Sequence, residues 1–163
     1  MSGLVRIEEG SDAAPVYCLS SHRRTITETD IVNFVNLTGL HEPPFIDMEW
    51  VKENMPGEHN KRFAPAPFLI SLGMGLVATS ITDLVATISR NEGLGPFHGM
   101  VGLEARVQRP AFPGDTLCVD LEGRVDRETE RGRTLVDLKH VLKNQRGETV
   151  LVFTEKLIFD KRM

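Results

Sequence analysis

Apolar residues recur at helical spacing in the first half of the chain. In the segment TETDIVNFVNLTG they return every three or four positions, which is typical of one face of a helix. Thr27, at the start of this segment, suits the N-cap of a helix, and Gly39 suits its C-terminal stop. The pattern predicts a helix over about residues 28–38. A second, shorter helix is predicted over about residues 47–55, with Asp47 as its N-cap.

A long uncharged stretch follows at residues 63–82. Its length is that of a transmembrane helix, but Pro65 and Pro67 stand at its start, and its helical phase continues through Asp83. These features favour the central helix of a soluble protein instead. That helix is predicted over about residues 67–89, buried on nearly all sides.

From about residue 100 onward the pattern changes to that of β-strands. Four runs, MVGLEARVQRP, TLCVDLEGRVDRE, RTLVDLKHVLKNQ and TVLVFTEKLIFD, are separated by turn-forming segments such as FPGD and NQRGE. In the third run, apolar residues and His140 share one face, while charged residues share the other. The chain is therefore predicted to be an α+β protein. Long antiparallel strands over about residues 100–160 would have their dry face covered by the central helix.

Composition places the chain among ordinary globular proteins, and its 163 residues are expected to form one domain, 1–163. A net charge of -4 disfavours binding to nucleic acid or to an anionic membrane. Cys18 and Cys118 form neither a metal-binding pattern nor a disulfide framework, so no metal site is expected. The first residues, MSGLVRIEEGSD, lack the apolar core of a signal peptide, and we expect a cytoplasmic protein.

A long helix wrapped by a curved antiparallel sheet is the hot-dog fold, and the chain resembles the MaoC-like dehydratase family, which has this fold. The resemblance runs from about residue 22 to residue 160. It is carried by TITETDIVNFVNLTG, FAPAPFLISLGMGLV, VQRPAFPGDTL and NQRGETVL. It implies one hot-dog domain with a helical overhang over about residues 27–62. It also implies a hydratase or dehydratase that adds or removes water at an α,β-unsaturated acyl thioester, assembled as a homodimer or a larger dimer-based oligomer. No separate cofactor is implied, because coenzyme A is part of the substrate.

The loop LTGLHEPPFID departs from the family pattern at two positions. In the family, the glycine that ends the helix is typically followed by an aspartate. Three residues, usually including Asn-Pro, and a hydrophobic residue then precede the catalytic histidine. These positions hold Leu40 and Phe45, and neither side chain can transfer a proton. His41 and Glu42 are the neighbouring groups that would replace the lost pair. Alternatively, the loop is a packing element, with His41 facing solvent.

Two further histidines are candidates for proton transfer. His98 lies in LGPFHGMVG, which is predicted to be a glycine-rich loop where a ligand could approach the backbone. The alternative is a surface histidine in a plain connecting loop. His140 lies on the apolar face of its strand, which favours a buried, hydrogen-bonded histidine of the core or an interface over a catalytic one.

The N-terminus of the central helix is where the family binds the thioester carbonyl, using a backbone N–H as the donor. By this resemblance the N–H of Ala66 would polarise the carbonyl. Phe68, Leu40 and Phe45 would contact the substrate.

Two other functions stay open from the sequence. One is a non-catalytic acyl-CoA-binding or structural hot-dog subunit, which the replacements at Leu40 and Phe45 favour. The other is an acyl-CoA thioesterase, in which a carboxylate on or near the central helix would direct water at the carbonyl. Asp83 lies far along that helix, which weakens the second alternative.

Overall fold

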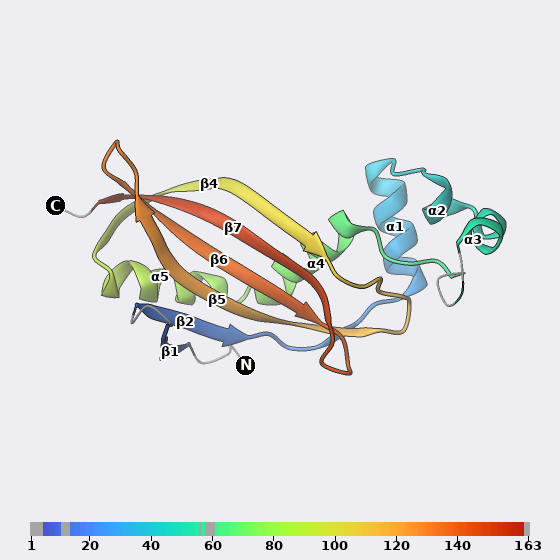
Figure 1. The fold of residues 1–163 in the computed structure, drawn as a ribbon, viewed down its shortest axis with the longest axis horizontal. Helices are drawn as coiled ribbons and strands as arrows, with labels where there is room; N and C mark the ends of the chain where they lie inside the picture. Colours follow the sequence, from blue (N-terminus) through green and yellow to red (C-terminus); the bar gives the residue numbers. More distant parts are fainter. Residues whose placement is uncertain (1–4, 11–13, 56, 58–60, 162–163) are drawn as a thin grey trace.

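The chain folds into a curved antiparallel sheet with helices along one face (Figure 1). The computed structural model describes residues 5–10, 14–55, 57 and 61–161. Among these residues the sheet has seven strands in the order β1-β2-β5-β6-β7-β4, with β3 paired to β5 beside this path. The strands are β1 (Arg6–Glu9), β2 (Pro15–Ser20), β3 (Arg24–Thr25), β4 (Leu94–Val107), β5 (Thr116–Glu128), β6 (Arg133–Lys143) and β7 (Thr149–Lys161). The predicted α+β class is confirmed.

Of the five helices in the described residues, the first three gather beyond one end of the sheet and the last two lie beneath it (Figure 1). The first group forms the overhang, and the second group covers the inner face of the sheet. The helices are α1 (Glu28–Thr38), α2 (Pro43–Ile46), α3 (Met48–Asn54), α4 (Ala66–Val77) and α5 (Ile81–Asn91).

The helix predicted over residues 28–38 is confirmed as α1, and both of its end signals act as expected. Thr27 and Asp30 form a capping box, in which each side chain accepts a hydrogen bond from the other residue's backbone N–H. Gly39 ends the helix in the left-handed conformation, with φ of 69°. The next predicted helix is confirmed as α3. The carboxylate of Asp47 caps it by accepting hydrogen bonds from two backbone N–H groups at 3.1 and 2.9 Å.

The prediction of one continuous central helix is wrong. α4 and α5 are separate helices that meet at an angle of 70°. Ser80, which is buried at the junction, has backbone angles outside the helical range. A straight helix over residues 67–89 would be about 35 Å long. Because the sheet twists and curves, two shorter helices follow its inner face where one straight rod would diverge from it.

Within the described residues, no single helix has both the length and the apolar character needed to cross a membrane. The bent pair α4 and α5 would satisfy that test only if the two were taken together.

β5, β6 and β7 begin where their runs were predicted, but β4 begins earlier than predicted. Three short N-terminal strands were not anticipated. The segment LGPFHGMVG, predicted as a loop, is the start of β4. Register shifts break its pairing with β7 near Phe97, Gly99 and Met100. Glycine and proline are tolerated there because β4 is an edge strand that pairs on one side only.

The core lies between the inner face of the sheet and the two central helices. Leu69, Leu72 and Leu76 of α4 are buried against inward residues of β5 and β7. Gly73 lets α4 approach the sheet closely, because a Cβ at this position would lie 2.8 Å from a ring carbon of Phe153. The sheet therefore holds the N-terminal end of α4 in a fixed position beside the overhang.

Candidate functional site

An apolar cavity of about 430 Å³ lies where the overhang meets the N-terminal end of α4. We call it the overhang cavity. Four separate segments contribute to its walls, and the lining includes Phe45, Met55, Phe63, Ala66, Leu69 and Val107. Its volume is within the range of small-molecule sites, and Arg109 is the one ionisable side chain among the described residues that line it.

Arg62 fixes the loop that forms one wall of the overhang cavity. Its guanidinium group donates a hydrogen bond to the backbone carbonyl of Phe45 and forms an ion pair with Glu28 at the start of α1. The ring of Phe45 packs edge-on against Phe63, with ring centroids 5.4 Å apart. The loop is thereby held against α1 and against the segment leading into α4.

Only two of the four residues expected to contact a substrate line the overhang cavity. Phe45 and Ala66 both line the overhang cavity. Leu40 is half-buried at the end of α1, where its N–H donates to a backbone carbonyl, and it lies outside the lining. Phe68 is buried and packs edge-on against Phe34 at 5.5 Å, so its ring belongs to the core between α1 and α4.

His41 and Glu42 lie together on the exposed side of the loop. Neither belongs to the lining of the overhang cavity. Glu42 occupies the N-cap position of α2, but its side chain makes no capping hydrogen bond. These two side chains are therefore close to the cavity in the sequence but do not line it. Their role in proton transfer stays a prediction.

His98 lies far from that loop within one chain. Its Nε2 is 2.8 Å from a carboxylate oxygen of Asp160, which also pairs with Arg133 at 3.5 Å. Val107, at the overhang cavity, is nine positions after His98 on the same strand, a distance of about 30 Å along an extended strand. A single copy of the chain therefore does not combine His98 with His41.

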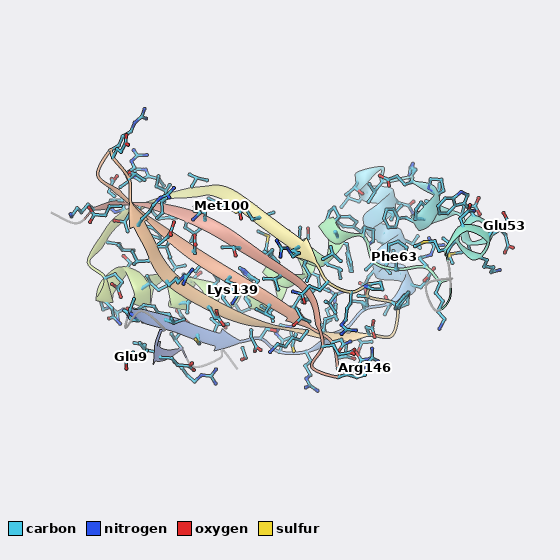
Figure 2. All side chains as sticks on the ribbon, viewed as in Figure 1. Glu9, Glu53, Phe63, Met100, Lys139 and Arg146 are labelled. Atoms are coloured by element: carbon cyan, nitrogen blue, oxygen red, sulfur yellow. The ribbon has the colours of Figure 1, made fainter. Side chains whose placement is uncertain are left out.

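A polar cavity of about 470 Å³ adjoins the overhang cavity, and Arg109 and Pro110 line both. We call it the basic flank. Its charged residues are Lys61, Arg109, Arg146, Asp115 and Glu148, so cations outnumber carboxylates there. Figure 2 shows Arg146 at the same end of the sheet as Phe63. An apolar chamber and a cationic surface are thus contiguous at this end of the molecule.

A carboxyl–imidazole pair lies beneath the middle of the sheet. The sequence did not predict this pairing. His140 on β6 is fully buried, as expected, and Nε2 of its ring faces Oε1 of Glu155 on β7 at 3.4 Å. The ring stacks on Phe153, with centroids 4.2 Å apart. Burial lowers the pKa of His140 to about 4, and burial raises the pKa of Glu155.

Glu155 was missed, although the sequence carries a signal for it. In TVLVFTEKLIFD it occupies the same alternating face as Leu151, Phe153 and Leu157. A glutamate among inward-facing apolar positions of a strand is unusual unless it is paired or functional. Among the described residues, no group of three or more histidine, cysteine, aspartate or glutamate side chains is arranged to hold a metal ion.

Comparisons with known proteins define the class of fold. The chain is similar in structure to a monoamine oxidase regulatory protein from Archaeoglobus, with a TM-score of 0.65, 28% identity and 90% of each chain covered. It is also similar to a MaoC-like dehydratase from Rhodospirillum rubrum, with a TM-score of 0.63, 22% identity, and 90% and 92% of the two chains covered. R-hydratase PhaJ1 from Pseudomonas aeruginosa has a TM-score of 0.53 at 19% identity, over 89% of this chain and 81% of that one. The predicted hot-dog fold is confirmed.

The sequence comparison points to the same group. Over 104 residues, 63% of this chain, the identity with Protein MaoC from Klebsiella aerogenes is 36%. The chain spans about a quarter, 27%, of the length of that relative. No family model matches the chain. The resemblance to MaoC-like dehydratases and R-hydratases that the sequence predicted is thereby confirmed.

Proposed function

We propose that the protein is a hydratase or dehydratase that adds or removes water at an α,β-unsaturated acyl thioester of coenzyme A. Several proteins of similar fold are (R)-hydratases or a 3R-hydroxyacyl-ACP dehydratase, which supports the reaction class. The observation that carries the substrate class is the overhang cavity, an apolar chamber at the N-terminus of α4 beside the basic flank. In an acyl thioester of coenzyme A, the apolar acyl chain matches the overhang cavity and the phosphorylated carrier matches the basic flank.

Ala66 supplies the group that would bind the thioester carbonyl. It is the first residue of α4 and lines the overhang cavity. The N–H groups in the first turn of a helix have no intrahelical acceptor, and they attract developing negative charge. The N–H of Ala66 would therefore stabilise the enolate-like oxygen formed when water adds to the β-carbon.

His41 and Glu42 are the groups proposed to move the protons. In hydration, the oxygen of water bonds to the β-carbon, one of its protons is taken up by a base, and the α-carbon receives a proton from an acid. An imidazole and a carboxylate in adjacent positions provide such a pair three residues before Phe45, which lines the cavity. Their exposure means that the loop must turn inward, or substrate must reach them, before they act.

We also propose a homodimer, formed through β4. This strand lies at the edge of the sheet, and it carries five of the eight large hydrophobic residues exposed in the described chain. An uncovered edge strand of this length and composition favours pairing with another strand. A two-fold antiparallel pairing of β4 would bring the start of one strand towards the end of the other. His98 of the second copy would then approach the overhang cavity.

A cytoplasmic location is proposed on a separate ground. Cys18 and Cys118 are both free thiols, which persist in a reducing compartment.

The test is to assay enoyl-CoA, 3-hydroxyacyl-CoA and saturated acyl-CoA for hydration, dehydration and release of free thiol. Hydration of enoyl-CoA, or its reverse, with no thiol release supports the proposal. Thiol release from saturated acyl-CoA would identify a thioesterase. That outcome has little structural support, because Asp83 is exposed and lines neither this cavity nor the one beside α5.

The proton-transfer groups are tested by turnover of His41→Ala, Glu42→Gln and His98→Ala. Loss of a true acid or base lowers turnover on the order of a hundredfold or more. Glu53→Gln is the matched control, because Glu53 is an exposed carboxylate on α3 away from the cavity lining (Figure 2). Near-parental turnover in all three test variants would reject the assignment.

A non-catalytic acyl-CoA-binding subunit is the second candidate. The observation that favours it is the lining of the overhang cavity, whose described residues include no imidazole or carboxylate. Saturable binding of acyl-CoA without turnover of any substrate in the assay would establish this function.

A further inference from the structure

A second cavity, of about 510 Å³, lies between α5 and the strands β4 and β7. We call it the α5 cavity. Val85 and Ala86 form part of its helical wall, and Met100, Leu157 and Phe159 form part of its sheet wall. Figure 2 places Met100 on β4, away from Phe63 and the overhang. The α5 cavity is therefore separate from the overhang cavity, and its volume is also typical of a small-molecule site.

Glu155 is the one ionisable side chain among the described residues that line the α5 cavity. Its side chain is 9% exposed, its Oε1 faces Nε2 of His140 at 3.4 Å, and its other oxygen has no hydrogen-bond partner among the described residues. Burying a carboxyl oxygen without a partner is costly, and native proteins rarely leave one so. A carboxyl group in this state, at the wall of an apolar cavity, marks a place where a ligand completes the hydrogen bonding.

His140 determines what the carboxyl group of Glu155 offers to the cavity. The Nδ1 of His140 lies 3.0 Å from the backbone carbonyl of Leu138. A carbonyl oxygen can only accept, so Nδ1 carries a proton and donates it to that bond. Nε2 then faces Glu155 either as a lone pair that accepts a proton or as an N–H that donates one.

In either position of the shared proton, Glu155 presents a hydrogen-bond acceptor to the cavity. If Glu155 is protonated, its O–H points at Nε2 of His140 and its other oxygen is an acceptor. If the proton is on Nε2, both oxygens of Glu155 are acceptors. A ligand must therefore supply a hydrogen-bond donor, whichever atom holds the proton.

We propose that the α5 cavity binds an uncharged, largely apolar small molecule that carries a hydroxyl group, and that Glu155 accepts a hydrogen bond from this hydroxyl. The apolar walls bury the hydrocarbon part. A hydroxyl provides the donor that an ether or a ketone lacks. A carboxylate ligand would oppose Glu155 with further acceptors, and an ammonium group would have to bury its charge among apolar residues.

The first experiment compares two isomers by calorimetric titration of the full chain. 1-Octanol and 1-methoxyheptane have the same atoms and similar length, but only the alcohol can donate a hydrogen bond. We expect saturable binding of 1-octanol with an affinity about tenfold higher than that of the ether, because the ether leaves Glu155 without a donor. Equal affinities would overturn the proposal. So would the absence of binding by both probes, which is the result expected if a second copy of the chain fills the cavity.

Substitutions of Glu155 test whether that residue causes the preference. Glu155→Leu keeps the size of the side chain but removes the acceptor, and we expect the two isomers to bind equally. Glu155→Gln retains an acceptor oxygen and should retain the preference for the alcohol. Glu122→Leu, on the outer face of β5 where Glu122 pairs with Lys139, is the matched control and should behave as the parent. A preference that survives in Glu155→Leu would overturn the proposal.

Two further measurements locate the probe and define its charge. Ala86→Phe places a ring in the α5 cavity, and unchanged binding of 1-octanol to this variant would show that the probe binds elsewhere and overturn the proposal. Tighter binding of octylammonium than of 1-octanol would likewise overturn the choice of an uncharged ligand. Ala66→Pro, which alters the overhang cavity, should leave binding of 1-octanol unchanged, so this test does not depend on the proposed hydratase activity.

Discussion

The overhang cavity and the α5 cavity divide between them the features expected of one active site. The overhang cavity lies where the resemblance to MaoC-like proteins predicts a substrate, but the described part of its lining includes no imidazole or carboxylate. The α5 cavity lies where no site was predicted, and its wall carries a buried carboxyl group paired with an imidazole. In this chain, therefore, the cavity in the expected position and the cavity with the carboxyl–imidazole pair are two different places.

The largest effect is expected from Phe153→Ala. The ring of Phe153 is buried between His140 and Gly73 of α4, and its removal should lower the free energy of unfolding by about 3–5 kcal/mol. Phe45→Ala, at the half-buried wall of the overhang cavity, should cost less than half as much. Urea unfolding of both variants measures the difference. Equal costs would show that the two regions contribute equally to stability.

Ala66→Pro should lower turnover about a hundredfold or more, since it removes the N–H proposed to stabilise the thioester oxygen. Proline suits the first position of a helix. Pro65 already has the extended conformation, with φ of -60° and ψ of 144°, that a following proline requires. The variant should therefore keep the melting temperature of the parent. Pro67→Ala, one residue further on, is the control and should retain turnover. Parental turnover in Ala66→Pro would show that the N–H of Ala66 takes no part in the reaction.

His140→Gln should flatten the pH dependence of stability. In the unfolded chain a histidine takes up a proton below about pH 6.5, but the folded chain leaves His140 neutral until about pH 4. Between these values the unfolded state binds more protons, so the free energy of unfolding falls as the pH falls. From pH 7 to pH 4.5 we expect a loss of about 2–3 kcal/mol from this residue, which the variant should lack.

Chemical denaturation at the two pH values measures this difference. His41→Gln, on the exposed loop, is the matched control and should keep the parental pH dependence. If His140→Gln loses as much stability on acidification as the parent, the buried imidazole is not the group responsible.

Asp47→Ala should have the smallest effect, a cost of about 1 kcal/mol in the free energy of unfolding. Its carboxylate accepts hydrogen bonds from the first N–H groups of α3 and points to no other described partner. Turnover should stay within a few-fold of the parent once folding is confirmed. A hundredfold loss of turnover in folded protein would place Asp47 in the chemistry rather than in the cap.

The parts of the fold that the sequence predicted are those set by local pattern. Thr27 and Gly39 mark the ends of α1 through hydrogen bonds within a few residues, and Asp47 caps α3 in the same way. The alternation in the last 60 residues identified strands because each has one buried face. The bend between α4 and α5 was not predicted, because it is determined by the curvature of the sheet and not by the residues at the bend.

The candidate site was less predictable, because its geometry depends on segments far apart in the chain. The sequence placed Phe45 and Ala66 at a common site, and the overhang cavity brings them together. It also offered His98 as an alternative to His41 near the start of the central helix, but β4 extends that residue to the other end of the sheet. Glu155 and His140 come together through the pairing of β6 with β7, and a register of that kind cannot be deduced from either strand alone.

The junction at Ser80 also divides the inner layer into two parts that should open independently. α4 has six buried residues and α5 has two, so less apolar area holds α5 against the sheet. Amide hydrogens of α5 should therefore exchange with solvent faster than those of α4. Transient release of α5 would expose one wall of the cavity that bears Glu155, giving an apolar molecule a route inward while the sheet and α4 stay folded.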